Sequence, residues 1–150
     1  MIIVASDSDK TTQKIGERLA RTTSRIGRQN NHALVFGLKG GLGAGKTTFI
    51  KGFVRGLGYK KRVTSPTFLI FKRLELKNKK FKNVFHVDAY RVRKPSDLNI
   101  LGFKRIVDDP KNIVLVEWAN KIKGRLPENM IWVRFDYGKN ENERKIIMNT

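Results

Sequence analysis

The segment Gly40-Gly-Leu-Gly-Ala-Gly-Lys-Thr47 constrains this chain more than any other feature. It fits the phosphate-loop template, in which a glycine, four variable residues and a second glycine precede a lysine and a threonine. The apolar run 33–38 before it predicts a strand, and the apolar spacing across 48–57 predicts a helix that stops at Gly58. A phosphate loop requires this order of strand, loop and helix, whereas an ordinary glycine-rich turn does not. We therefore expect an anion-binding loop at residues 40–47.

Each residue type in the segment has a physical reason. Glycines let backbone N–H groups turn inward around an anion without a clash from Cβ, and the helix beginning near Lys46 directs the positive end of its dipole at the same point. Lys46 is predicted to reach the β- and γ-phosphates of a nucleoside triphosphate, and the Thr47 hydroxyl is predicted to coordinate Mg²⁺. The predicted nucleotide-binding residues of this segment are Gly40, Gly41, Leu42, Gly43, Ala44, Gly45, Lys46, Thr47 and Thr48.

The rest of the chain predicts a mixture of strands and helices. A first helix is expected to begin at one of several N-cap candidates in 6–9 and to run to about residue 28, with Ile15, Leu19 and Ile26 on its apolar face. Short helices are expected at 95–101 and 103–108, and strands at 2–5, 67–76, 81–88, 113–116, 130–137 and 144–148. The last two strands, like 67–76 and 81–88, are spaced as antiparallel hairpins. These patterns predict a single α/β domain over 1–150: a P-loop NTPase fold whose mixed, mostly parallel sheet carries antiparallel hairpins and is flanked by helices.

Two acidic residues stand directly after apolar strands, where open α/β sheets collect their ligands. Glu117 follows 113–116 and is the predicted carboxylate on the magnesium side, and Asp88 follows 84–87 and is expected to orient the attacking water or the ion. The segment 64–68 follows the helix of the phosphate loop, where switches of P-loop proteins contact the γ-phosphate, although alone it is an ordinary turn. Trp118, next to Glu117, is a better functional candidate than Trp132, and His86 is expected to have a core or hydrogen-bonding role.

Composition limits the remaining possibilities. The chain has 32 Lys and Arg against 13 Asp and Glu, a formal net charge of +19, but the basic residues are spread along it. The positive charge therefore contributes to binding of RNA or of an acidic protein surface, or it reflects a composition common to the proteins of the lineage. The absence of cysteine excludes disulfides, a thiolate nucleophile and cysteine-based zinc sites. No apolar run approaches the roughly 20 residues that a membrane span needs, and the start lacks the pattern of a signal peptide, so we expect a cytoplasmic protein.

Several motifs together resemble one family. Four motifs stand in the order and spacing of the TsaE (YjeE) family. They are the phosphate loop with Thr48-Phe49, then Thr64-Ser-Pro-Thr-Phe68, His86-Val-Asp-Ala-Tyr-Arg91 and Glu117-Trp118. The resemblance covers nearly the whole chain. It implies a mixed-sheet P-loop fold, ATP with Mg²⁺ and weak intrinsic ATP hydrolysis. It also implies partnership with the TsaB–TsaD complex, which attaches threonylcarbamoyl to an adenosine beside the anticodon of tRNA; hydrolysis would reset that complex between turnovers.

The resemblance also implies roles for single residues. Lys46, Thr67, Asp88 and Glu117 are the implied catalytic residues, and Thr47, Asp88 and Glu117 are the implied magnesium side of the site. Ser65 matches the switch loop and Trp118 the aromatic residue after the acid. Arg144 and the region from Ser6 to Thr12, with Thr12 as its candidate residue, match positions near the nucleotide. The chain departs from the family at Gly41, where an acidic residue is usual, so a partner contact through that acid is in doubt.

Three alternatives remain. A small GTPase-like switch is suggested by Asn120-Lys-Ile-Lys123, but Lys123 has only donors where guanine requires an acceptor. A small-molecule kinase would need an arginine-rich lid and an acceptor pocket, for which 150 residues leave little room. A basic RNA-binding module that uses nucleotide only as a structural ligand would show binding that weakens steeply with salt.

Overall fold

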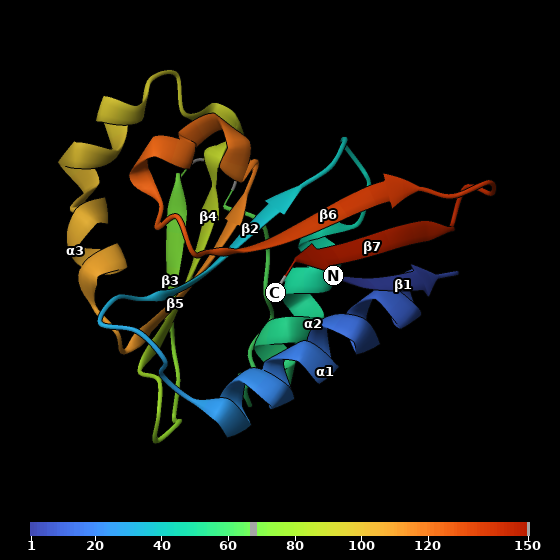
Figure 1. The fold of residues 1–150 in the computed structure, drawn as a ribbon, viewed down its shortest axis with the longest axis horizontal. Helices are drawn as coiled ribbons and strands as arrows, with labels where there is room; N and C mark the ends of the chain where they lie inside the picture. The colour runs from blue at the N-terminus through green and yellow to red at the C-terminus, as the bar shows by residue number, and fades with distance from the viewer. Residues whose placement is uncertain (67–68, 150) are drawn as a thin grey trace.

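The computed structural model describes residues 1–66 and 69–149, which build one seven-stranded sheet in the order β1-β7-β6-β2-β5-β4-β3 (Figure 1). The four central strands β6, β2, β5 and β4 are parallel, and β3 and β7 pair antiparallel with β4 and β6. This confirms the mixed sheet and both hairpins. The strands are β1 (Ile2–Ser6), β2 (Leu34–Lys39), β3 (Phe71–Glu75), β4 (Asn83–Asp88), β5 (Asn112–Glu117), β6 (Ile131–Tyr137) and β7 (Arg144–Asn149).

Helical elements cover both faces of the sheet, because each face of its buried strands is apolar. Helices α1 (Asp9–Ile26) and α2 (Lys46–Gly56) pack on one face, and α3 (Phe103–Asp108) with three 3₁₀ helices packs on the other (Figure 1). The 3₁₀ helices are η1 (Ala89–Arg91), η2 (Pro95–Leu101) and η3 (Ala119–Arg125). Alternation along β2 divides the two cores: Phe36 and Leu38 face α2, while Val35 faces the side of α3.

Glycine lets α1 and α2 approach closely, while Ile15 and Leu19 pack against the core as predicted. The buried residues of α1 are small, namely Thr12, Gly16, Ala20 and Thr23, whereas Ile26 is 58% exposed. The prediction that Ile26 belongs to the apolar face is therefore wrong; the helix ends at Ile26 and Gly27 caps it. A Cβ at Gly16 would lie 2.4 Å from the Phe49 carbonyl oxygen, so the two backbones approach too closely for larger residues.

This close approach predicts the effect of Gly52→Ala. Alanine is favoured over glycine in a helix interior by about 1 kcal/mol. At position 52, however, the new Cβ would stand 2.0 Å from the Gln13 carbonyl oxygen, on the rigid backbone of α1. We expect overpacking to dominate and to lower the free energy of unfolding by about 1–3 kcal/mol, and hence the Tm by about 2–4 °C per kcal/mol. Gly124→Ala is the control, since a Cβ there meets nothing within 4 Å; equal Tm values would contradict the packing argument.

The remaining differences from the sequence-based expectation are local. The strand expected at 67–76 begins at Phe71, and Thr67 lies outside the described residues. Helix η3 was not expected, because its sequence lacks a regular apolar spacing and its backbone kinks at Ile122. Among residues 1–66 and 69–149, no helix combines the length and the apolar character required to cross a membrane.

Candidate nucleotide-binding site

The phosphate loop connects β2, which ends at Lys39, to α2, which begins at Lys46. Gly43 and Gly45 have φ angles of 70° and 101°, so the backbone takes a left-handed conformation that glycine adopts without strain. The loop borders a cavity of about 500 Å³. Loop residues 42–48 line it together with Asp9, Ser65, Asp88, Glu117, Trp118, Glu141, Asn142 and Arg144. The predicted motifs from four distant parts of the sequence thus meet in one place.

Lys46 is held against the loop itself. Its Nζ donates to the carbonyl oxygens of Gly40 and Gly41, at 2.7 Å each, and lies 4.4 Å from the centroid of the Trp118 ring. Burial lowers the pKa of the Lys46 ammonium below its ordinary value, while the nearby carboxylates of Glu117 and Asp88 oppose that shift. The lysine is therefore a desolvated cation at the mouth of the loop, where its attraction for an anion is least screened.

Glu117 connects the loop to the neighbouring strand. Its Oε1 accepts a hydrogen bond of 2.6 Å from the Thr47 hydroxyl, and its Oε2 lies 3.2 Å from His86 Nε2. Burial, the largest single influence, would raise the pKa of Glu117. The interactions with His86, the hydrogen bond from Thr47 and the charge of Lys46 outweigh it and lower that pKa. Glu117 is thus an ionised carboxylate fixed at both oxygens.

His86 has the hydrogen-bonding role expected for it. The ring is 1% exposed on β4, and its Nε2 faces Glu117, while its Nδ1 has no hydrogen-bond partner among the described residues. It therefore fixes the orientation of the carboxylate rather than standing as a metal ligand of its own. Ser65 contacts the other partner of the carboxylate, since its Oγ lies 3.2 Å from Thr47 Oγ1.

Asp88 and Trp118 stand at the ends of adjacent strands. Asp88 is paired in register with Glu117, lines the cavity, and accepts a hydrogen bond of 3.0 Å from the Tyr90 N–H. Trp118 has a φ of 58°, which is uncommon for a bulky residue. This turn ends β5 directly after Glu117 and places the indole against both Tyr90 and Lys46. The strained residue therefore adjoins the acid and the lysine on which the site depends.

The β6–β7 hairpin braces the phosphate loop through two hydrogen bonds. Arg144 Nη2 donates to the Gly43 carbonyl at 2.9 Å, and the Tyr137 hydroxyl donates to the Leu42 carbonyl. The Arg144 guanidinium also lies 5.5 Å from the centroid of the Tyr137 ring. Both donors hold carbonyl groups of the loop, and the loop N–H groups are not used by these two contacts. The sequence placed Arg144 near the nucleotide but did not predict this contact or that of Tyr137.

The position of Tyr137 gives a reason for glycine at position 41. A Cβ there would lie 2.5 Å from the Tyr137 hydroxyl oxygen. We expect Gly41→Ala to displace the tyrosine from Leu42 and to lower the Tm, and Tyr137→Phe to lessen that loss because it removes the clashing oxygen. Thermal unfolding of the two single variants and the double variant measures the coupling. Strictly additive losses would show that the two residues do not compete for this space.

Not every predicted site residue lines the cavity. Thr12 is 1% exposed, and its hydroxyl lies 2.7 Å from the hydroxyl of Ser6, beneath the loop. Gly40 and Gly41 border the adjacent groove and face the site through their carbonyls. Thr67 lies outside the described residues. Asp9, within the implied region 6–12, does line the cavity. Glu141 and Asn142 also line it but were not singled out; their nearness to Arg144 in sequence was the available signal.

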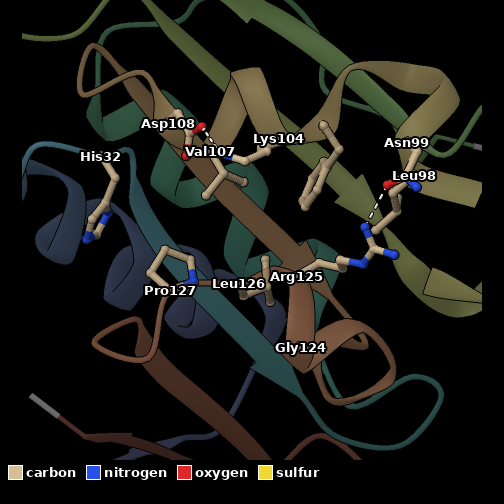
Figure 2. Close-up of a pocket in the computed structure, with 11 residues that line it drawn as sticks. His32, Leu98, Asn99, Lys104, Val107, Asp108, Gly124, Arg125, Leu126 and Pro127 are labelled. Atoms are coloured by element: carbon tan, nitrogen blue, oxygen red, sulfur yellow. Dashed lines mark hydrogen bonds and ion pairs between the residues drawn. The ribbon is translucent and has the colours of Figure 1, made fainter. Parts of the chain in front are cut away.

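A second cavity, of about 480 Å³, lies between η2, α3 and η3 (Figure 2). Its wall includes Leu98, Phe103, Val107 and Leu126, all nearly buried. The charged side chains that line it are engaged: Arg125 donates to Asn99 at 2.6 Å, and Lys104 pairs with Asp108 at 2.5 Å (Figure 2). None of the phosphate-loop residues lines this cavity.

A glycine-rich phosphate loop between a central parallel strand and a helix defines the class of fold, a P-loop α/β domain. The model of the TsaE family, described as threonylcarbamoyl adenosine biosynthesis protein TsaE, matches residues 6–146. The chain therefore belongs to the TsaE family, which confirms the resemblance drawn from its motifs.

Individual relatives agree with this assignment. The tRNA threonylcarbamoyladenosine biosynthesis protein TsaE of Haemophilus influenzae is 31% identical, over 91% of this chain and 83% of that protein. The protein of the same name from Bacillus subtilis is 40% identical over 66% of this chain and 59% of its own length. The crystal structure of Bacillus subtilis YdiB superposes with a TM-score of 0.72 at 29% identity, covering 97% of this chain and 82% of that one.

Proposed function

We propose that this protein binds Mg²⁺-ATP at the phosphate loop and hydrolyses it slowly, in support of threonylcarbamoyladenosine formation on tRNA. The observation that carries the proposal is the hydrogen bond of 2.6 Å between Thr47 and Glu117, beside the buried ammonium of Lys46. A hydroxyl and a cation at the start of one helix, with an ionised carboxylate from the neighbouring strand, are the groups that a metal-bound triphosphate requires. We place this activity in the cytoplasm, where tRNA is modified.

The described residues fit a triphosphate. The cavity has a volume of about 500 Å³ and is bordered by the backbone of 42–48 at the N-terminus of α2. Backbone N–H groups and the helix dipole would hold the phosphates there. Lys46 would exchange the carbonyls of Gly40 and Gly41 for phosphate oxygens, which attract its charge more strongly than neutral carbonyls do.

The same residues fit a magnesium ion that is shared with the substrate. Mg²⁺ prefers oxygen ligands and is usually held by one or two carboxylates together with waters and substrate phosphates. The Thr47 hydroxyl donates a hydrogen bond to Glu117, and this leaves a lone pair of the threonine oxygen for a metal. No cluster of three or more Asp, Glu or His suited to a metal occurs in the described part of the chain, which agrees with a shared ion. When bound, Mg²⁺ neutralises charge that develops on the phosphates.

The arrangement also supports slow hydrolysis without a partner. Asp88 lies beside Glu117 at the carboxyl ends of β4 and β5, where both line the cavity. It is the residue that we assign to orienting the attacking water. Among the described residues, Arg144 is the one arginine that lines the cavity, and its guanidinium already donates to three backbone carbonyls. Within residues 1–66 and 69–149, no second arginine lines the cavity. An arginine that stabilises the charge on a transferred γ-phosphoryl group is worth about 10³–10⁵ in kcat. A partner protein that supplied one, or that rearranged Arg144, would stimulate turnover.

We propose TsaB- and TsaD-like proteins as these partners, with hydrolysis resetting their complex between modification cycles. Phosphate release should be measured for this protein alone and with both purified partners present. We expect a slow basal rate and a clear stimulation. An unchanged rate with partners that demonstrably modify tRNA would refute the resetting role and leave ATP binding to be judged separately.

A GTPase-like switch receives less support from the structure. Lys123 is exposed in η3, and Asn120 lines the neighbouring groove rather than the cavity of the loop. Competition of ATP and GTP against a fluorescent nucleotide distinguishes the two, and a preference for GTP would contradict the assignment.

A further inference from the structure

Beyond α2, the chain forms an exposed surface that the nucleotide site does not use. Two adjoining grooves, of about 640 and 770 Å³, share residues 58–61 and lie on either side of the segment after the helix. The first also contains Lys51, Arg55 and Arg62, and the second contains Arg73 and Lys77 of the β3–β4 hairpin. We call the two together the basic groove.

The charge of the basic groove differs from that of the rest of the surface. Seven of its thirteen lining residues are Lys or Arg, and one, Glu75, is acidic, whereas the whole chain has 32 basic and 13 acidic residues. The cavity at the phosphate loop has two basic and four acidic residues, and the cavity of Figure 2 has Lys104 and Arg125 against Asp108. The positive charge that looks diffuse in the sequence is therefore concentrated here by the fold.

These cations are also available for a ligand. Within residues 1–66 and 69–149, Arg55 is the only one of the seven within ion-pair distance of an acid, at 3.8 Å from Glu17. Lys60, Lys61 and Arg62 are exposed, on consecutive positions of a segment without regular secondary structure. Like charges held this closely repel one another, and a polyanion relieves that repulsion.

We propose that the basic groove binds the phosphodiester backbone of RNA. A protein partner would require an apolar centre that loses its water on binding. The apolar members of this lining are Tyr59, Val63 and Leu76, and they are part of the core or pack against it. A phosphate backbone needs no such centre, because its affinity comes mainly from the release of counterions by Lys and Arg. The shape, the charge and the absence of an exposed apolar patch in the lining therefore favour nucleic acid over an acidic protein.

The test is the affinity of the full chain for an unmodified, fluorescently labelled tRNA transcript over a series of salt concentrations, without nucleotide. The test variant replaces Lys60, Lys61 and Arg62 with alanine. The control replaces Arg93, Arg105 and Lys123 with alanine. This removes the same charge from exposed positions on the other side of the sheet. We expect the test variant to lose about tenfold or more in affinity, and its log–log salt slope to fall by about 0.7–0.9 per lost cation. The control should stay close to wild type.

Each other outcome would overturn the proposal. Equal losses in the two variants would mean that net charge alone attracts RNA. An absence of binding to tRNA at low salt would exclude the site. Displacement of tRNA by poly-glutamate as readily as by unlabelled RNA would assign the groove to acidic proteins. Because no nucleotide is present, these results do not depend on the proposed ATPase, and an unchanged Tm of the test variant would show that its fold is intact.

Discussion

Lys46→Ala is expected to weaken nucleotide binding by roughly two orders of magnitude. The side chain supplies the buried cation of the loop, and in its absence the phosphates would lose the charged side chain that contacts them and keep the backbone N–H groups and the metal. Charge-assisted hydrogen bonds contribute about 1.5–3 kcal/mol each, so the Kd for Mg²⁺-ATP should rise by roughly 100-fold, since each 1.4 kcal/mol is about tenfold. Calorimetric titration of the folded variant with millimolar Mg²⁺-ATP measures this directly.

Lys39→Ala is the matched control for that experiment. It removes a lysine directly before the loop, where the side chain lies 5.1 Å from the centroid of the Trp132 ring and outside the cavity. Binding by this variant should stay near the wild-type value. If ATP bound equally well to Lys46→Ala and to wild type, the loop would not be the phosphate site.

Glu117→Ala is expected to separate binding from chemistry. The carboxylate touches Thr47 and His86 rather than the loop backbone, so most of the phosphate contacts should survive its removal. Loss of a group that positions a metal ligand typically costs about 10–100-fold in activity or metal affinity. We therefore expect the rate of phosphate release to fall by that factor or more, with a much smaller change in the Kd for ATP.

Glu117→Gln distinguishes charge from packing. The amide keeps the size of the side chain, and its oxygen can still accept the Thr47 hydrogen bond, but the negative charge beside Lys46 is lost. If the ionised carboxylate is required, the glutamine variant should hydrolyse ATP as poorly as the alanine variant, although it should be more stable. Wild-type turnover in both would remove Glu117 from the reaction.

Local patterns in the sequence were sufficient for much of the fold. The phosphate loop, the hairpins and the strand tips at Asp88 and Glu117 each depend on neighbours in sequence, and all of them were predicted near their observed places. The order of the strands was not predictable, because pairing of β2 with both β5 and β6 involves segments that are distant in the chain.

The parts of the site that were missed depend on contacts across elements. The brace from Tyr137 and Arg144 to the loop joins residues about a hundred positions apart, and no periodicity indicates it. The close packing of α1 on α2 depends on glycines, which sequence patterns treat as helix breakers. The basic run 60–62 stands in the sequence, but its neighbourhood with Arg73 and Lys77 depends on how the β3–β4 hairpin packs beside that segment.

A short stretch of backbone connects the basic groove to the cavity at the phosphate loop. Residues 58–63 run from the end of α2 directly into Ser65, whose hydroxyl lies 3.2 Å from that of Thr47. A ligand that orders this segment would shift the position of Ser65, and a nucleotide that draws Thr47 toward its metal would tighten the same segment from the opposite end. Thermodynamic linkage makes such an influence reciprocal: the factor by which ATP changes the affinity for RNA equals the factor by which RNA changes the affinity for ATP.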